Sequence, residues 1–415
     1  MRVVHLSAYD LLGGAAKAAF RLHGTLADLG VESTLLVRRR DSTRDDVLQP
    51  QGAFMQLWSR VQRRCDRLPL LFAGSSAREY SPGWVPDGLA GQLQALQPDI
   101  VHLHWVAHGF VRPDLLPRIG VPVVWTMHDM WPFTGGCHYA GACRNFTQAC
   151  GRCPLLGGQR EADLSRAGWQ RRRQAFARKR VTFVSPSRWL AAQARTSALL
   201  NAADIRVIPN GIDEACFVPH LPSPARQRWG LPPDKIVLLA GSAQLNDNPR
   251  KGFGDLLQAL EILRGAVAPG SVELALFGGA RGPVTELAGF PAHNLGVLTD
   301  DQAMASVYAA ADVFVAPSLE DNLPNTIIEA MAVGTPVVAY AAGGIPEIVD
   351  HEVNGLVVPV GQVAGLAAGM LRMCTDGAWR RGCGQRAREK VEQVLGRIGS
   401  AGAYRDLYEE LSGRT

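Results

Sequence analysis

The stretch from Pro317 to Pro336 reads PSLEDNLPNTIIEAMAVGTP and joins a short loop, a polar turn and an apolar run. Residues 312–316, just before it, form a short apolar segment that ends at a proline, which is typical of a buried strand. Asn325 or Thr326 can cap the helix that we expect next, and the N–H groups at a helix start can bind a phosphate. The stretch therefore predicts a strand, a ligand-binding turn and a helix.

Two carboxylates flank this turn, with seven residues between them. Asp321 precedes the turn and Glu329 lies on the predicted helix, where carboxylates can accept hydrogen bonds from sugar hydroxyls. The turn can thus hold phosphate, ribose and hexose together. The alternative is that Asp321 only caps a turn and that Glu329 is a solvated helix residue.

This block resembles the acidic E-x7-E motif of the family 4 retaining glycosyltransferases, which have the GT-B fold. The flanking segments 311–318 and 334–339 fit the family as well, and GGIPEIV at 343–349 follows at the usual distance. One position departs from the family, because Asp321 stands where Glu is commoner, with Glu320 just ahead of it. The resemblance implies an α/β protein with two Rossmann-like, doubly wound parallel-sheet domains that face a central cleft.

Length and composition agree with two soluble domains. A chain of 415 residues is too long for one ordinary core, and 47% hydrophobic with 20% charged residues is typical of a globular protein. No apolar stretch approaches the roughly 18 residues of a membrane span. The start, MRVVHLSAYDLLGG, lacks the pattern of a signal peptide and indicates a first strand, so we expect a cytoplasmic protein.

Both halves alternate apolar strand-like runs with helical connections, which predicts parallel sheets. The expected strands are 3–6, 31–37, 100–104, 121–127, 181–184 and 205–208, then 236–241, 272–277, 313–316 and 337–340. PNGID at 209–213 is similar to the family's link between domains. The resemblance then implies an acceptor domain at 1–210, a nucleotide-sugar donor domain at 211–395, and a final crossover helix at 396–415 that packs back on the first domain.

The charge is unevenly distributed along the chain. Residues 1–210 hold 27 Lys and Arg against 15 Asp and Glu, whereas residues 211–415 hold 16 against 23. A basic first half indicates an anionic partner. Because no nucleic-acid-binding motif accompanies the charge, we expect no nucleic acid, and favour an anionic membrane surface or a pyrophosphate-linked acceptor.

The segment 54–72, FMQLWSRVQRRCDRLPLLF, has the pattern of an interfacial helix. Its apolar residues at helical spacing are Phe54, Leu57, Trp58 and Val61, and its basic residues are Arg60, Arg63, Arg64 and Arg67. We expect peripheral attachment to the inner membrane. The alternative is an amphipathic helix packed on the sheet with a solvated basic face.

The family resemblance also implies the residues of the site. His128, after a buried strand, matches the histidine that reaches the donor sugar, and Arg250 with Lys251 matches the basic pair that contacts the diphosphate. The expected catalytic residues are His128, Lys251, Asp321 and Glu329, and the expected donor- or substrate-binding residues are Gly13, Gly14, Arg250, Gly278, Val297, Leu298, Leu323, Asn325 and Thr326. His102 and His104 are interpreted as structural or rim residues. Ser242-Ala243-Gln244 stands where the family often has a further arginine.

Four of the eight cysteines, Cys137, Cys143, Cys150 and Cys153, fall in one glycine-rich loop. The last two have the two-residue spacing of half a zinc knuckle, and the first two can complete a four-sulfur site. Reduced cysteines without a metal are the alternative, since disulfides are disfavoured in a reducing cytoplasm.

The expected reaction is transfer of a hexose from a UDP- or GDP-sugar to a saccharide or polyprenyl-linked acceptor in surface polysaccharide assembly. We expect that catalysis requires no cofactor. A structural zinc at the four cysteines would shape the loop and take no part in the reaction. Two alternatives stay open at this stage. A sugar-nucleotide 2-epimerase has the same fold, although its S-G-G-x-Q-E-E run is not found here, and a non-catalytic nucleotide-binding partner protein is the other.

Overall fold

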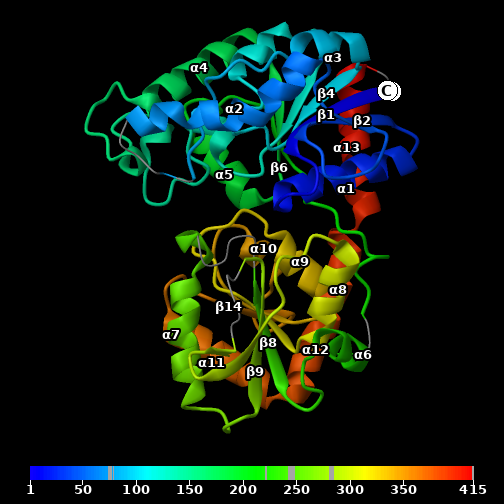
Figure 1. Ribbon diagram of the computed structural model, residues 1–415, viewed down its shortest axis with the longest axis vertical. Coiled ribbons are helices and arrows are strands. Elements are labelled where there is room, and N and C mark those ends of the chain that lie inside the picture. The colour runs from blue at the N-terminus through cyan, green and yellow to red at the C-terminus, as the bar shows by residue number, and fades with distance from the viewer. Residues whose placement is uncertain (73–76, 78, 220–221, 242–247, 280–284, 414–415) are drawn as a thin grey trace. The chain divides into compact units, whose positions relative to one another are not determined.

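The computed structural model describes residues 1–72, 77, 79–219, 222–241, 248–279 and 285–413 (Figure 1). The chain divides into two compact units. Unit 1 comprises Met1–Pro209 and Ser400–Thr415, and unit 2 comprises Asn210–Gly399. Ser242-Ala243-Gln244, considered above, lies outside the described residues.

Unit 1 is built on a parallel seven-stranded sheet with the order β3-β2-β1-β4-β5-β6-β7. Its elements are β1 (Arg2–Tyr9), α1 (Gly14–Asp28), β2 (Glu32–Arg39), β3 (Val47–Leu48), α2 (Ala53–Phe72), α3 (Ala90–Leu96), β4 (Ile100–Leu103), η1 (Pro113–Arg118), β5 (Val123–Thr126), η2 (Trp131–Phe133), η3 (Asn145–Thr147), η4 (Pro154–Leu156), α4 (Leu164–Arg178), β6 (Val181–Ser185), α5 (Arg188–Thr196), β7 (Ile205–Val207) and most of α13 (Arg397–Ser412). β4 and β5 are short and buried throughout, as expected of central parallel strands.

Unit 2 repeats the design with the strand order β10-β11-β9-β8-β12-β13-β14, in which only the β10–β11 pair is antiparallel among the described strands. Its elements are α6 (Pro222–Trp229), β8 (Ile236–Gly241), η5 (Pro249–Lys251), α7 (Phe253–Arg264), β9 (Val272–Phe277), β10 (Glu286–Leu287), β11 (Phe290–Asn294), α8 (Asp301–Ala310), β12 (Val313–Ala316), α9 (Asn325–Ala332), β13 (Val337–Tyr340), α10 (Ile345–Ile348), β14 (Gly355–Val358), α11 (Val363–Thr375) and α12 (Gly377–Val394). One continuous core lies between these strands and helices.

Each sheet has one place where the strand order reverses. In unit 1 it lies between β1 and β4, and in unit 2 between β8 and β12. Loops that follow such a pair of strands diverge and leave a crevice where ligands of doubly wound sheets bind. Arg250 and Lys251 follow β8, Asp321 and Glu329 follow β12, and Gly13 follows β1.

The last helix completes the core of unit 1. Tyr404, Leu407 and Tyr408 of α13 are buried against residues of β1, β4 and β5, and Figure 1 shows the helix, in red, beside β1 and β2. The Tyr408 hydroxyl lies 2.6 Å from His102 Nδ1. The Tyr404 hydroxyl lies 2.8 Å from the hydroxyl of Thr126.

The sequence predicted both parallel-sheet units, and every expected strand is present. It missed β3, β10, β11 and β14, which are short or carry polar residues and proline. The predicted cap of the helix after Asp321 is wrong: α9 begins at Asn325, Pro324 occupies the N-cap, and neither Asn325 nor Thr326 caps the helix with its side chain. None of the described helices is both long enough and apolar enough to cross a membrane.

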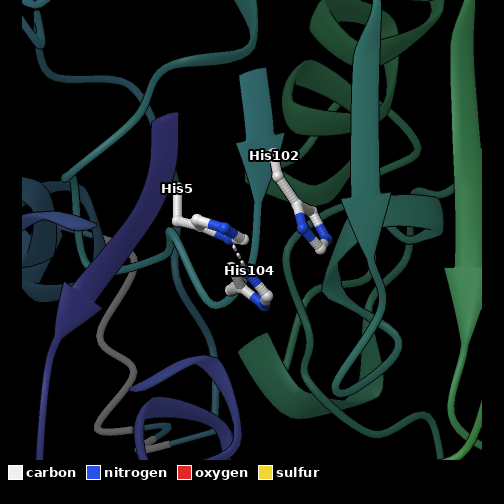
Figure 2. Close-up of side chains that lie close together, drawn as sticks. All are labelled: His5, His102 and His104. Carbon is white, nitrogen blue, oxygen red and sulfur yellow. Dashed lines mark hydrogen bonds between the residues drawn. The ribbon is translucent and has the colours of Figure 1, made fainter. Parts of the chain in front are cut away.

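Three buried histidines lie close together, as Figure 2 shows: His5 on β1, His102 on β4 and His104 just after β4. His5 and His102 are direct neighbours across the two strands. His5 Nδ1 lies 3.0 Å from His104 Nε2. Burial, and the proximity of the other imidazoles, hold the pKa of each ring well below its ordinary value, so these rings are neutral in the folded protein.

We expect unit 1 to lose stability in mild acid. The unfolded chain binds protons at these histidines near pH 6.5 while the folded state does not, so the free energy of unfolding falls as pH drops below that value. The loss is about 1.4 kcal/mol per histidine for each pH unit between 6.5 and the folded pKa. Urea unfolding at pH 7 and pH 5, followed by tryptophan fluorescence, measures it, because seven of the nine tryptophans lie in unit 1.

The His102→Gln variant serves as the comparison, since it removes one titrating ring and should show a shallower dependence on pH. Equal stability of the unsubstituted protein at pH 7 and pH 5 would contradict the neutral state of the cluster.

Candidate functional site

A buried ion pair forms the centre of the candidate site in unit 2. Asp321, in the loop after β12, accepts a hydrogen bond from Lys251 Nζ at 2.6 Å, and Arg250 Nη1 lies 3.6 Å from the same oxygen. Both cations belong to η5, the turn that precedes α7. The side chain of Asp321 is 9% exposed, and those of Arg250 and Lys251 are 15% and 17% exposed. The loops after β8 and β12 therefore place two cations and one carboxylate together.

The backbone explains why these loops lie so close. Gly252 has a φ of +69°, and a Cβ there would stand 1.8 Å from the carbonyl oxygen of Pro317. The Leu319 N–H donates to the Arg250 carbonyl at 2.8 Å. Gly343, with a φ of +58°, has a similar role on the other side, since its Cβ would stand 1.6 Å from the Asp321 carbonyl oxygen. Only glycine fits at either position.

Lys251 and Arg250 determine the protonation state of Asp321. Burial by itself raises the pKa of this carboxyl group, but Lys251 and Arg250 outweigh burial, so the net pKa lies below its ordinary value. Asp321 is thus ionised at neutral pH. Its other oxygen accepts the Asn322 N–H at 3.1 Å, which fixes the orientation of the carboxylate.

Glu329 lies on the buried side of α9 and is 3% exposed. Its Oε2 accepts a hydrogen bond from the Tyr308 hydroxyl at 3.1 Å. The alternative in which Glu329 is a solvated helix residue is therefore wrong. A carboxylate held in this way, one turn into a helix, is oriented by its surroundings in advance of any ligand.

The remaining predicted donor-binding residues follow neighbouring strands of the same sheet. The Gly278 N–H donates to the Gly296 carbonyl at 2.9 Å, which joins the loops after β9 and β11. Val297, next to that contact, is 71% exposed. Leu323 is buried in the core, and the Asn325 side chain accepts from Asn210 Nδ2 at 3.1 Å. Leu298 packs partly on the core.

In unit 1, Gly13 and Gly14 open α1 after β1. Gly13 has a φ of +90°, and a Cβ there would meet no atom within 4 Å, so the loop is open toward the exterior at this point. The sequence reasoning missed Asp10, which anchors this loop. The buried Asp10 carboxylate accepts N–H groups from Leu11, Asp41 and Ser42 at 2.8 to 3.0 Å. Nothing in the local sequence pattern marks that role.

His128 lies just past β5 and is half-buried. Its Nε2 lies 3.3 Å from His104 Nδ1, so His128, His104 and His5 form a chain of imidazoles. Burial lowers the pKa of His128 to about 4, and Asp129 opposes this only in part. His104 and His102 are buried members of this cluster and not rim residues.

Asp129 is a second residue that the sequence reasoning missed. It is buried and accepts from His138 Nδ1 at 2.6 Å, from Trp105 Nε1 at 2.7 Å and from the Trp131 N–H at 2.8 Å. Burial would raise the pKa of Asp129, but these partners, with His138 first, hold it below its ordinary value. The carboxylate thereby fixes the start of the loop that follows His128.

Known families match most of the chain. A model described as "Glycosyltransferase Family 4" matches residues 12–215, and one described as "Glycosyl transferases group 1" matches residues 234–376. A D-inositol 3-phosphate glycosyltransferase of Xylanimonas cellulosilytica is 31% identical over 86% of this chain and 84% of its own length. The putative colanic acid biosynthesis glycosyl transferase WcaC of Escherichia coli is 29% identical over 55% of this chain and 54% of its own.

Solved structures show the same fold. Sucrose-phosphate synthase of Thermosynechococcus elongatus superposes with a TM-score of 0.71 at 20% identity, over 100% of both chains. Anabaena HepE in complex with UDP-glucose superposes with a TM-score of 0.66 at 18% identity, over 99% of this chain and 100% of its own. The two parallel-sheet α/β units thus match GT-B glycosyltransferase structures, and the chain belongs to the family 4 glycosyltransferases.

Proposed function

We propose that this chain transfers a hexose from a UDP- or GDP-sugar to a saccharide or polyprenyl-linked saccharide during surface polysaccharide assembly, with retention of the anomeric configuration. The observation that carries the proposal is the pair of cations, Arg250 and Lys251, held on Asp321 next to the start of α9. Two similar proteins support parts of this proposal. WcaC is named for colanic acid biosynthesis, which supports polysaccharide assembly, and HepE was solved with UDP-glucose, which supports a nucleotide-sugar donor. Other relatives are named for inositol phosphate and mannosyl transfer.

In unit 2 we place the donor diphosphate against Arg250, Lys251 and the N-terminus of α9. Cleavage of the bond to the sugar leaves negative charge on the diphosphate, and fixed cations stabilise that charge without reorganisation. Asp321 holds the Lys251 ammonium in position before the donor binds. The helix start adds N–H groups and the positive end of the helix dipole.

We place the ribose on Glu329, because its hydroxyls can donate to the carboxylate that Tyr308 orients. Asp321 and His128 are the remaining predicted catalytic residues. Asp321 has a shorter side chain than the family's commoner glutamate, so its reach toward the hexose is reduced. Asp321 therefore acts mainly on the two cations.

Replacement of Glu329 by glutamine should weaken nucleotide binding. The amide keeps the size of the side chain and the bond from Tyr308 but loses the charge, and hydrogen bonds to charged groups contribute about 1.5 to 3 kcal/mol. We expect UDP or GDP, whichever binds the unsubstituted protein, to bind roughly 10- to 100-fold more weakly in a calorimetric titration. Glu261→Gln, at an exposed position of α7, is the matched control. Equal affinity in the two variants would refute the placement of the ribose.

The chemistry that we propose needs no divalent metal, because Arg250, Lys251 and the helix start supply the positive charge. The acceptor attacks the anomeric carbon from the face on which the diphosphate departs. A diphosphate oxygen takes the acceptor's proton on that same face. The sugar thus keeps its configuration.

Proton NMR of the product should show the anomeric configuration of the donor, and activity should persist when EDTA is added to the assay. An inverted anomer would overturn the proposed chemistry. So would a loss of activity that Mg²⁺ or Mn²⁺ restores. A loss that only Zn²⁺ restores would report on the cysteine loop discussed below and not on the transfer step.

We further propose that α2 docks on an anionic membrane surface, where the sugar of a lipid-linked acceptor would lie. Its solvent face carries exposed apolar side chains, Phe54, Leu57, Leu68 and Leu71, beside exposed Arg60, Arg63 and Arg64. This corrects part of the sequence interpretation, since the Trp58 indole N–H donates to the Pro86 carbonyl and faces the protein. A helix with apolar and basic groups on one exposed face suits a lipid surface.

Sedimentation with anionic liposomes at low and high salt tests the docking. Each arginine near the surface contributes about 1 kcal/mol, so we expect binding at low salt that high salt removes. The double variant Leu57→Gln, Leu71→Gln should sediment less, whereas Ile262→Gln, an exposed apolar residue of unit 2, should behave like the unsubstituted protein. No sedimentation at low salt would rule docking out.

A further inference from the structure

Four cysteines surround one small cavity in unit 1. Cys137, Cys143, Cys150 and Cys153 all line a space of about 20 Å³ in the loop between η2 and α4. None of them forms a disulfide. A space of this size holds one water-sized particle or ion. The loop therefore places four cysteines around one cavity, although they lie up to sixteen positions apart in the sequence.

A buried cation lies next to these cysteines without a counter-ion. Arg172 of α4 is 0% exposed, and its Nε and Nη2 have no hydrogen-bond partner among the described residues. Its Nη1 donates to the Gly168 carbonyl at 3.0 Å, and the guanidinium stacks 4.2 Å from the centre of the Trp131 ring. Within the described part of the chain, no carboxylate lies within 4.0 Å of it.

The groups around Arg172 that can carry negative charge include Tyr80, Cys150 and Cys137. As thiols these cysteines are neutral and leave the cation uncompensated, which is costly in a buried site. Asp66 interacts with Arg172 only weakly, and burial raises the pKa of Asp66 to about 6. Thiolates at the cysteines would remove the imbalance, and a bound metal ion is what keeps buried thiols deprotonated at neutral pH.

Backbone hydrogen bonds shape the loop at its last two cysteines: the Cys153 carbonyl accepts the Leu156 N–H at 3.1 Å and the Gly158 N–H at 3.2 Å. Between these two cysteines the chain turns through Gly151 and Arg152, both with positive φ. These turns bring Cys150 and Cys153 to the same cavity.

We propose that Cys137, Cys143, Cys150 and Cys153 bind one structural zinc ion and that Arg172 balances its charge. Zinc with four thiolates carries two negative charges, which the buried guanidinium offsets in part. Binding would draw the sulfurs to about 2.3 Å from the ion, closer together than they now lie. The site would pin the loop after His128 to α4 and takes no part in the transfer step, so the proposal stands apart from the proposed function.

A histidine cluster is the competing metal site. His5, His102 and His104 are the one group among the described residues whose possible ligand atoms all lie within 4.8 Å of one another. Yet both ring nitrogens of His102 are already bonded, to the Tyr408 hydroxyl at 2.6 Å and to the Thr126 hydroxyl at 2.8 Å. A metal there would have to break one of these bonds, so the cysteines are the better site.

The metal content of the purified protein tests the proposal. After expression with added zinc, reducing purification and gel filtration, we expect about one zinc per chain by plasma mass spectrometry. A mercurial thiol reagent should release it. Protein substituted with cobalt(II) should show sulfur-to-metal charge-transfer absorption, which histidine ligands do not give. Both measurements use the unsubstituted protein, so they hold even where a variant fails to fold.

Variants then locate the ion. Cys150→Ser combined with Cys153→Ser should lose the zinc, whereas Cys65→Ser, a cysteine of α2 in the same unit, should retain it. Arg172→Gln should release zinc to a chromogenic chelator faster than Arg166→Gln on the same helix. A zinc-free protein with four reactive thiols would overturn the proposal, and so would an intact mass that reveals two disulfides. Zinc that survives in the double cysteine variant but disappears in His5→Gln would place the metal at the histidines instead.

Discussion

The close approach of Gly252 to the carbonyl oxygen of Pro317 is the constraint on which the candidate site in unit 2 depends. It brings the turn after β8 against the loop after β12 through backbone atoms alone. Arg250 and Lys251 then reach Asp321 from short loops, which limits the freedom of two otherwise flexible side chains. Because β8 and β12 flank the point where the strand order reverses, this contact also sets where the two loops stand above the sheet.

Buried charged side chains have hydrogen-bonding or ionic partners through most of the molecule. Asp321 has two cations, Glu329 has the Tyr308 hydroxyl, and Asp129 has His138 with two further N–H donors. Removal of water from a charge is costly unless such partners replace it. Arg172 departs from this pattern among the described residues, and it does so beside four cysteines. The position of Arg172 beside the cysteines therefore supports a metal site in this loop more strongly than the spacing of the cysteines does.

Local patterns in the sequence were enough to predict both sheets and most of their strands, and the family resemblance assigned the basic pair and the acidic turn to one site. Those features depend on short-range periodicity and on loops that follow neighbouring strands. The remaining features depend on contacts between distant residues. His102 meets Tyr408 across 306 positions, and His5 meets His104 across 99. β11 contains Pro291, so its own residues do not indicate a strand. Its position in the sheet is set by its pairing with β9. The cap of α9 was mispredicted because Pro324 fixes the N-cap geometry by its own ring.

The position of α13 has a consequence for how the protein is made. The ribosome releases the strands of unit 1 first, but Tyr404, Leu407 and Tyr408, which cover one face of that sheet, emerge only after the 190 residues of unit 2. At 5 to 20 residues per second, translation of unit 2 takes roughly 10 to 40 seconds. During that interval Val3, Ile100 and Val124 lack their covering helix, and unit 2 can fold as a complete body before unit 1 does. Unit 1 therefore has its complete core only after the whole of unit 2 has been synthesised.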